Sequence, residues 1–247
     1  MIPLTTLKRR KNSSVLFILA LFLITSCTSI LSAKFESDTV GNLPNKTLPG
    51  NPSGDEITFI SEIEGQLEVV ASTASGSGKA LQYKGSSISS SIPATNTWLN
   101  FKSKSSNFVN PVTFIWSARR NFPSSGADLL VDISDGSAIL AARIKISHDG
   151  TVRLITDLVS GAGIDIGTLP NNEQHTVTLT VDLSKGSYNI GILKSSGNLN
   201  RSDVPLITSN IASFHNPARP TVSFKYDHYI SSFTYIIDEV FINRKKD

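Results

Sequence analysis

Acidic side chains are the first candidates for chemistry in this sequence. Retaining glycosidases need two carboxylates about 5 Å apart, and a strand that carries them at alternate positions places both on one face. Glu36 and Asp38 have this spacing, but Gly41 stands where a further glutamate of such a set would follow. Metal-binding clusters of His and Cys, serine-nucleophile motifs and glycine-rich phosphate loops are missing. Three histidines are each isolated in the sequence: His175, His215 and His228. The sequence therefore leans against an enzyme, although distant side chains could still converge in space.

The second candidate is a flat aromatic ring among polar neighbours. In a predicted strand over 97–103, Trp98 shares a face with Asn100 and Lys102, and the two apolar residues between them point the other way. An indole ring stacks on the apolar face of a sugar, while amide and ammonium groups bond its hydroxyls. The alternative is an ordinary surface aromatic at the rim of the core. Residues at the ends of two other predicted strands could extend this binding surface: Arg119, Arg120, Phe122, Tyr226, His228 and Tyr229.

Period-2 alternation of apolar and polar residues recurs from residue 34 onward, and no segment there has the period of a helix. The clearest case is 175–183, where three aliphatic residues alternate with three threonines. Asp149-Gly150 and Lys185-Gly186 predict tight hairpins. Many short strands joined by such turns favour an all-β, antiparallel sandwich or jelly roll. The other predicted strands are 67–73, 80–84, 97–103, 112–120, 128–133, 139–147, 151–157, 188–194, 221–227 and 233–243.

The N-terminal segment has the order of a secretory signal. A basic cluster at 8–11 precedes an apolar run at 15–24, which is too short to span a bilayer comfortably. The next residues, Thr25-Ser26-Cys27, with Ile24 before them, resemble the lipobox of bacterial lipoprotein precursors. The resemblance implies that Cys27, the single cysteine, is alkylated with diacylglycerol and that residues 1–26 are removed. An ordinary signal peptide cut elsewhere and an uncleaved anchor are the alternatives.

The segment 27–33 is small and polar, and we expect it to be the lipidated cysteine and a short tether before one domain over 34–247. The formal charge of +3 includes the four basic residues at 8–11 and no acid before Cys27, so the exported part carries −1. A near-neutral domain gives no electrostatic case for nucleic acid. We therefore expect a protein held on the cell envelope by its lipid. Thr28 is not the Asp that retains some enteric lipoproteins at the inner membrane, which favours the outer membrane.

Three further stretches carry a resemblance to a fold family. The opening 35–44, the hairpin over 177–190 and the closing Ile236-Ile237-Asp238-Glu239-Val240 resemble the concanavalin A-like, laminin G-like jelly-roll superfamily. The resemblance implies two stacked antiparallel sheets in which the first and last strands are neighbours. It implies no single function, because the fold carries lectins, hydrolases, lyases and adhesion modules.

Asp238 lies in a strand whose two faces both look apolar, which is costly for a carboxylate without a partner. If the terminal strands are neighbours, Glu36 and Asp38 approach Asp238 and provide an oxygen cage for calcium. In related jelly-roll carbohydrate modules, an early Glu and a late Asp hold a structural calcium ion. The alternative is that Asp238 accepts ordinary hydrogen bonds and that the other two carboxylates are solvated.

Together these features predict a lipid-anchored envelope protein with a non-catalytic β-sandwich that binds glycans or another envelope polymer. A lyase or glycoside hydrolase of the same fold is the first alternative. A protein-binding component of adhesion or assembly is the second.

Overall fold

The computed structural model describes residues 27–45, 56–60, 66–72, 78–85, 98–103, 111–122, 128–135, 139–207, 219–226 and 233–245. Every regular element in these ranges is a strand, and no helix among them is long and apolar enough to cross a membrane. The strands are β1 (Cys27–Lys34), β2 (Glu56–Ile60), β3 (Leu67–Ala71), β4 (Lys79–Gly85), β5 (Trp98–Lys102), β6 (Val112–Asn121), β7 (Leu129–Ser134), β8 (Leu140–Ile146), β9 (Thr151–Ile155), β10 (Gly163–Thr168), β11 (Gln174–Asp182), β12 (Ser187–Lys194), β13 (Leu199–Pro205), β14 (Thr221–Tyr226) and β15 (Phe233–Lys245).

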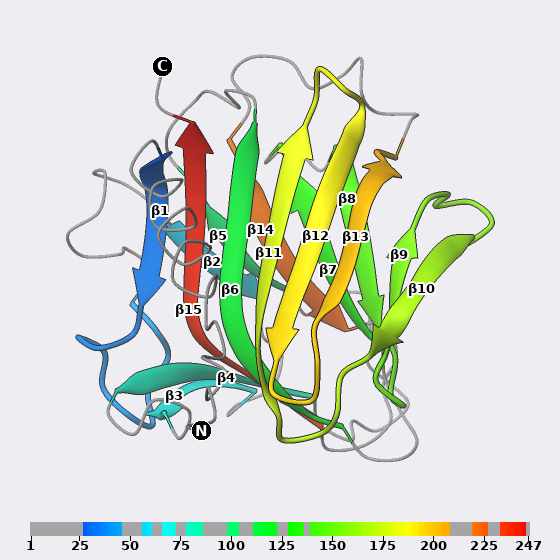
Figure 1. Cartoon of the computed structure of the whole chain (residues 1–247). Helices are drawn as coiled ribbons and strands as arrows, with labels where there is room; N and C mark the ends of the chain where they lie inside the picture. Colours follow the sequence, from blue (N-terminus) through cyan, green and yellow to red (C-terminus); the bar gives the residue numbers. More distant parts are fainter. Residues whose placement is uncertain are drawn as a thin grey trace, which may run out of the picture.

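The described strands form two antiparallel sheets packed face to face (Figure 1). Sheet A has the order β13-β12-β11-β6-β15-β4-β3, and β1 also pairs with β15. Sheet B has the order β10-β9-β8-β7-β14-β5-β2. The all-β antiparallel sandwich predicted from the sequence is therefore confirmed. The first strand does pair with the last, but it is β1, whereas the opening 35–44, which was expected to provide that strand, contains none.

Alternation along the strands builds the core. In β6 and β11 every second side chain is buried, and Trp116, which the sequence places in the core, is fully buried. Its ring meets Phe224 of sheet B edge to face, with centroids 5.9 Å apart. Packing of the inner faces of two sheets in this way gives a sandwich its stability.

Both hairpins predicted from the turn sequences are present. Asp149-Gly150 joins β8 to β9, and Lys185-Gly186 joins β11 to β12. Gly150 and Gly186 have φ values of 91° and 65°, a region that glycine enters without steric cost.

The expected tether is instead a strand. Residues 27–34 form β1 and pair with residues 239–245 of β15. The physical reason is that Leu31 and Ala33, which look merely small and apolar in the sequence, pack fully buried into the core. The sheet therefore begins at the cysteine and not several residues after it.

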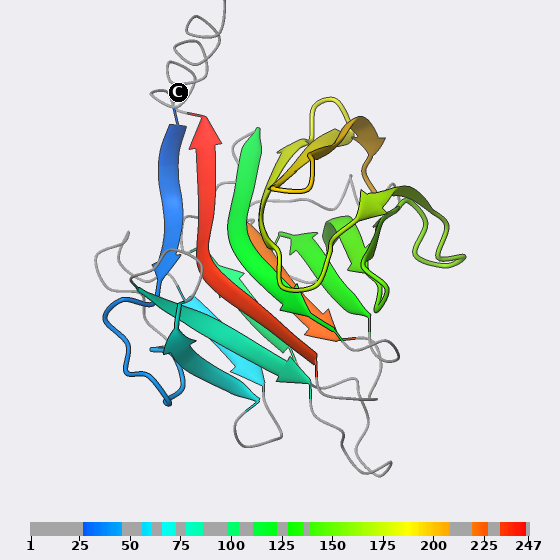
Figure 2. The same ribbon diagram turned by 60° about the horizontal axis from the view of Figure 1, so that its bottom comes forward.

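Strand β15 is divided by a β-bulge at Asp238, and its ribbon, red in Figure 2, bends part-way along. On one edge, residues 233–237 pair with β4 and residues 239–245 pair with β1, so β1 and β4 diverge on either side of the bulge. The extra residue shifts the alternation: Ile237 and Val240 point inward, and Asp238 and Glu239 are both half-buried. The prediction that Asp238 lies among apolar neighbours on its face is therefore wrong.

Candidate functional site

The outer face of sheet B carries the predicted aromatic site. Trp98, Asn100 and Lys102 alternate along β5 with Leu99 and Phe101, which are fully buried in the core. The three polar-face residues are half-buried. The assignment of the two faces of this strand from the sequence is confirmed.

Strand β14 completes this surface with two residues that were not predicted to belong to it. Lys225 lies directly opposite Trp98, and Ser223 lies opposite Asn100. Residues that face each other across an antiparallel pair have Cβ atoms about 5 Å apart, so indole, ammonium, amide and hydroxyl groups share one patch. We call Trp98, Asn100, Ser223 and Lys225 the Trp98 surface. Their place on an outer face could have been predicted from the sequence, because Ser223 and Lys225 alternate with buried residues in β14.

The charges beside the Trp98 surface are mostly paired. Arg143 donates two hydrogen bonds to Asp132, at 2.6 and 2.7 Å, and Lys145 forms an ion pair with Asp128. The side chain of Lys225, by contrast, forms no ion pair with the part of the chain that the structure describes. Its ammonium group could therefore meet a ligand next to the indole ring.

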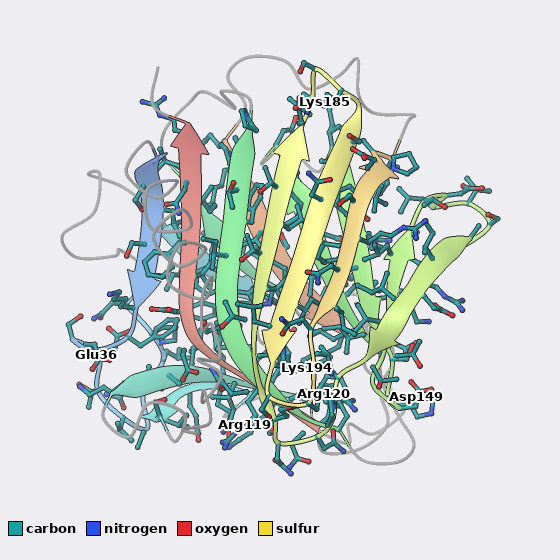
Figure 3. All side chains as sticks on the ribbon, viewed as in Figure 1. Glu36, Arg119, Arg120, Asp149, Lys185 and Lys194 are labelled. Carbon is teal, nitrogen blue, oxygen red and sulfur yellow. The ribbon has the colours of Figure 1, made fainter. Side chains whose placement is uncertain are left out.

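The other residues proposed to extend this surface lie elsewhere. Arg119 is on the outer face of sheet A, opposite Gln174 of β11, so it belongs to the other side of the sandwich (Figure 3). Arg120, Phe122 and Tyr226 are buried. Those three predictions are wrong, because the alternation turns these side chains inward. His228 and Tyr229 lie outside the described residues.

Arg120 is a charged side chain buried inside the sandwich. Its guanidinium donates hydrogen bonds to the backbone oxygens of Leu169 and His148, the latter at 3.2 Å. It therefore ties the end of β6 to the turn that joins β8 to β9. Burial lowers the pKa of Arg120 from its usual value.

His175 is also buried, with 1% of its surface exposed. Its Nε2 lies 3.0 Å from the hydroxyl of Tyr235, which accepts a hydrogen bond from the Trp116 indole at 3.1 Å. Nδ1 lies 3.3 Å from the backbone oxygen of Glu173. These partners suit a neutral ring, and burial lowers the pKa of His175 to about 4. A ring so enclosed holds the core together and does not reach a substrate.

The three carboxylates proposed to bind calcium have separate partners. Asp38 accepts a hydrogen bond from Asn45, and burial raises the pKa of Asp38. Asp238 accepts hydrogen bonds from Ser72 at 2.7 Å and from Gln174 at 2.6 Å. Glu36 lies beyond the end of β1 near the β3–β4 hairpin (Figure 3), where the backbone N–H of residue 79 donates to its Oε1 at 3.4 Å.

The residues present do not fit a calcium ion in this region. Lys79 donates hydrogen bonds from its ammonium group to the backbone oxygens of Glu36, at 2.9 Å, and Asp38. A calcium ion would need such carbonyl oxygens, together with carboxylates, as ligands. In the described part of the chain, no three His, Cys, Asp or Glu side chains gather as metal ligands would. The ammonium of Lys79 thus occupies two of the backbone oxygens that a calcium ion beside Glu36 and Asp38 would need.

Asp238 and Glu36 nevertheless line a common cavity. It has a volume of about 310 Å³ and opens on the outer side of sheet A at the bulge of β15. We call it the fork pocket, because it lies where β1 and β4 diverge. Its lining residues are Lys34, Glu36, Ser72, Lys79, Ser117, Gln174, Asp238 and Glu239.

Comparison with known proteins gives a fold and no family. No protein-family model matches the sequence, and no curated protein does. Among solved structures, the binding domain of botulinum neurotoxin serotype D/C is 13% identical with a TM-score of 0.54, over 89% of this chain and 49% of that one. The chain thus spans about half the length of the neurotoxin structures that it matches.

Two further structures match along nearly their whole length. The endo-β-1,4-glucuronan lyase of the fungus Trichoderma reesei is 9% identical with a TM-score of 0.54, over 89% of this chain and 96% of that one. A carbohydrate esterase from a Shiga toxin-encoding bacteriophage is 14% identical with a TM-score of 0.53, over 90% and 100%. At such identities these likenesses establish the β-sandwich fold alone.

Proposed function

We propose that this chain is a lipid-anchored protein of the bacterial cell envelope whose β-sandwich binds glycans without cleaving them. The observation that carries the proposal is the Trp98 surface, where Trp98 with its half-buried indole lies opposite Lys225, whose ammonium forms no ion pair with any described residue. Sugars present an apolar face for stacking and a rim of hydroxyls for hydrogen bonds. The surface offers both kinds of contact on rigid strands.

The charge of the surface favours acidic glycans. Lys225 and Lys102 both lie on the outer face with Trp98, and the nearby carboxylate of Asp132 is neutralised by Arg143. A carboxylate or sulfate group on a sugar stacked against the indole would meet Lys225 in a charge-assisted hydrogen bond, which is stronger than a neutral one.

The structural neighbours support this proposal only through the fold. One of them is a lyase of glucuronan, another a carbohydrate esterase, and a report on the type C neurotoxin links cell entry to two ganglioside molecules. Those ligands belong to those proteins. They indicate that sandwiches of this shape are compatible with carbohydrate ligands. The support from this chain itself comes from the Trp98 surface.

The lipid anchor in this proposal is Cys27. Because β1 begins at that residue, a lipidated Cys27 would hold the sandwich directly against the headgroups, with no spacer. Two or three acyl chains, at about 0.8 kcal/mol per buried methylene, anchor a protein far more firmly than a single chain. Labelled palmitate should enter the wild-type protein in bacteria and should not enter the Cys27→Ser variant; equal labelling of both would exclude this anchor.

Glycan binding is tested by retention of the purified protein on a glycan array and in polysaccharide affinity gels. The Trp98→Ala variant should lose retention, and the Lys225→Met variant should lose it for acidic glycans only. Phe241→Ala is the matched control, because Phe241 is a half-buried aromatic on the outer face of sheet A. Circular dichroism should show that all three remain folded. No retention of the wild-type protein on any glycan would refute the proposed function.

A further inference from the structure

The end of the sandwich that carries Cys27 also carries a run of basic residues. Arg244 and Lys245 of β15 pair with the first two residues of β1, and Lys245 lies directly opposite Cys27. Lys246 follows in the sequence, and one acid, Asp247, comes after it. The fold thus brings three consecutive basic residues from a distant part of the sequence to the proposed site of lipid attachment.

Neither neighbouring strand neutralises the charge of Arg244. Its side chain is half-buried and forms no ion pair with a residue that the structure describes. The residues opposite it are Thr28 of β1 and Val112 of β6, and neither of them is acidic. The sheet therefore places a positive charge at this end without an acidic residue across from it.

The hairpin between β11 and β12 lies at the same end of sheet A. In Figure 1 this hairpin, the start of β1 and the end of β15 all lie at the top, and the strands run down from them. Lys185, labelled in Figure 3, is on the turn of the hairpin. Its side chain is 72% exposed, and its ammonium lies 3.6 Å from Asp182. A flat surface that touches this end would therefore lie across the strands.

We propose that Cys27, Arg244, Lys245 and Lys246, which we call the basic end, rest on a membrane surface of anionic phospholipid. This inference rests on the proposed lipid anchor. The acyl chains would hold the domain at one point, about which it could still turn, whereas headgroups bound by the basic residues would provide a second contact. Each basic residue close to an anionic membrane contributes about fivefold in affinity, so three contribute about a hundredfold.

This contact would keep the Trp98 surface away from the membrane. The hydroxyl of Ser103 donates a hydrogen bond to the backbone oxygen of Ile30 in β1, at 3.0 Å, so the last residues of β5 lie near the basic end. Trp98 begins β5, five residues before Ser103, which places it about 16 Å farther along the strand. A domain held with its strands perpendicular to the bilayer thus presents Trp98 clear of the headgroups.

The test is co-sedimentation of the chain 27–247 carrying Cys27→Ser with phospholipid vesicles at low ionic strength. This chain keeps every strand that the structure describes, and it has no acyl chain to hold it on lipid. It should bind vesicles that contain anionic phosphatidylglycerol, and it should bind pure phosphatidylcholine vesicles at least about tenfold more weakly. Added salt should weaken the binding, because it screens exposed charges. Equal binding to both kinds of vesicle would overturn the proposal.

Variants locate the contact. The triple variant Arg244→Gln/Lys245→Gln/Lys246→Gln should bind the anionic vesicles about a hundredfold more weakly, and Arg244→Lys, which keeps the charge, should bind as its parent does. Arg201→Gln is the control, because it removes a positive charge from an exposed position on β13, and it should bind as its parent does. If the triple variant does not fold, Lys246→Gln, which lies beyond β15, decides the question with an expected loss of about fivefold; an unchanged affinity would refute the contact.

The lipidated protein in the same anionic vesicles tests the orientation. A quencher attached to the lipid headgroups should reduce the tryptophan fluorescence less in the wild type than in the triple variant. Trp116 is fully buried, whereas Trp98 would approach the headgroups only when the domain tilts. Equal quenching of the two proteins would refute the orientation.

The outcomes separate this inference from the proposed function. Vesicle binding without palmitate labelling of Cys27 would refute the anchor and support the lipid contact. Labelling without vesicle binding would refute this inference alone. Retention on glycan arrays depends on the Trp98 surface of sheet B, so the triple variant should be retained as the wild type is.

Discussion

Lowering the pH should destabilise the protein through one buried ring. His175 is neutral in the folded state: its Nε2 accepts from the Tyr235 hydroxyl, which itself accepts from the indole of Trp116. Protonation would place a second N–H where this chain of hydrogen bonds needs an acceptor, inside a core that excludes water. Burial is the main reason that the pKa of His175 falls from 6.5 to about 4 in the folded protein.

The size and sign of the effect follow from these two values. Between pH 6.5 and 4 the unfolded chain binds a proton at His175 and the folded chain does not, so the free energy of unfolding falls as the pH falls through this window. A difference of about 2.5 units at 1.36 kcal/mol per unit gives a loss of about 3 kcal/mol. Below pH 4 both states are protonated, and this residue causes no further loss.

The assay compares wild type with His175→Gln by urea unfolding, followed by tryptophan fluorescence from pH 7 to pH 4. Other titrating groups affect both proteins and cancel in the difference. We expect His175→Gln to be less stable at pH 7 and the gap to shrink by about 2–3 kcal/mol at low pH. A gap that stays constant across the whole window would show that His175 already carries its normal pKa in the fold.

Three further predictions concern the fold. Gly150→Ala should lose about 2 kcal/mol or more of stability in denaturant titrations, because a Cβ there would clash with the backbone oxygen of Leu169 and with the buried guanidinium of Arg120. Gly161→Ala, at a φ of 68° in open space, should lose only about 1 kcal/mol; equal losses would contradict the steric explanation. Neither calcium nor a chelator should change the melting temperature, because the ammonium of Lys79 already holds the local carbonyl oxygens; an increase with calcium would disprove that replacement. Trp116→Phe should cost about 1–3 kcal/mol in urea unfolding through lost volume and a lost hydrogen bond, and an unchanged midpoint would contradict that packing.

Alternation in the sequence was enough to predict the sandwich and to assign the faces of β5 and β11. It failed at Asp238, because a bulge adds a residue without a mark in the sequence and reverses the faces beyond it. Strand β1 was missed because small residues such as Ala33 read as linker until their burial is known. Strands β2, β10 and β13 were missed too; β13 is almost entirely exposed and polar, so it carries no apolar period.

The site predictions were incomplete for a different reason, namely that the sites combine residues from different strands. Trp98 and Asn100 could be placed together because they lie on one strand. Lys225 joins them only through the pairing of β5 with β14, and Lys79 reaches Glu36 across more than forty residues of sequence. Register between distant strands depends on the packing of the whole core, so local patterns do not contain it.

The pairing of β1 with β15 has a mechanical consequence. The paired residues of the two strands extend from Cys27 opposite Lys245 to Lys34 opposite Glu239. The hydrogen bonds of an antiparallel pair lie perpendicular to the strand axis. A pull on Cys27 along β1, as drag on a captured polymer would exert against a membrane anchor, loads these bonds in shear and shares the force among them. The buried side chains of Leu31 and Ala33 must leave the core in the same movement. The proposed attachment at the start of β1 would thus let the domain resist tension, whereas a pull across the strand would break the hydrogen bonds one after another.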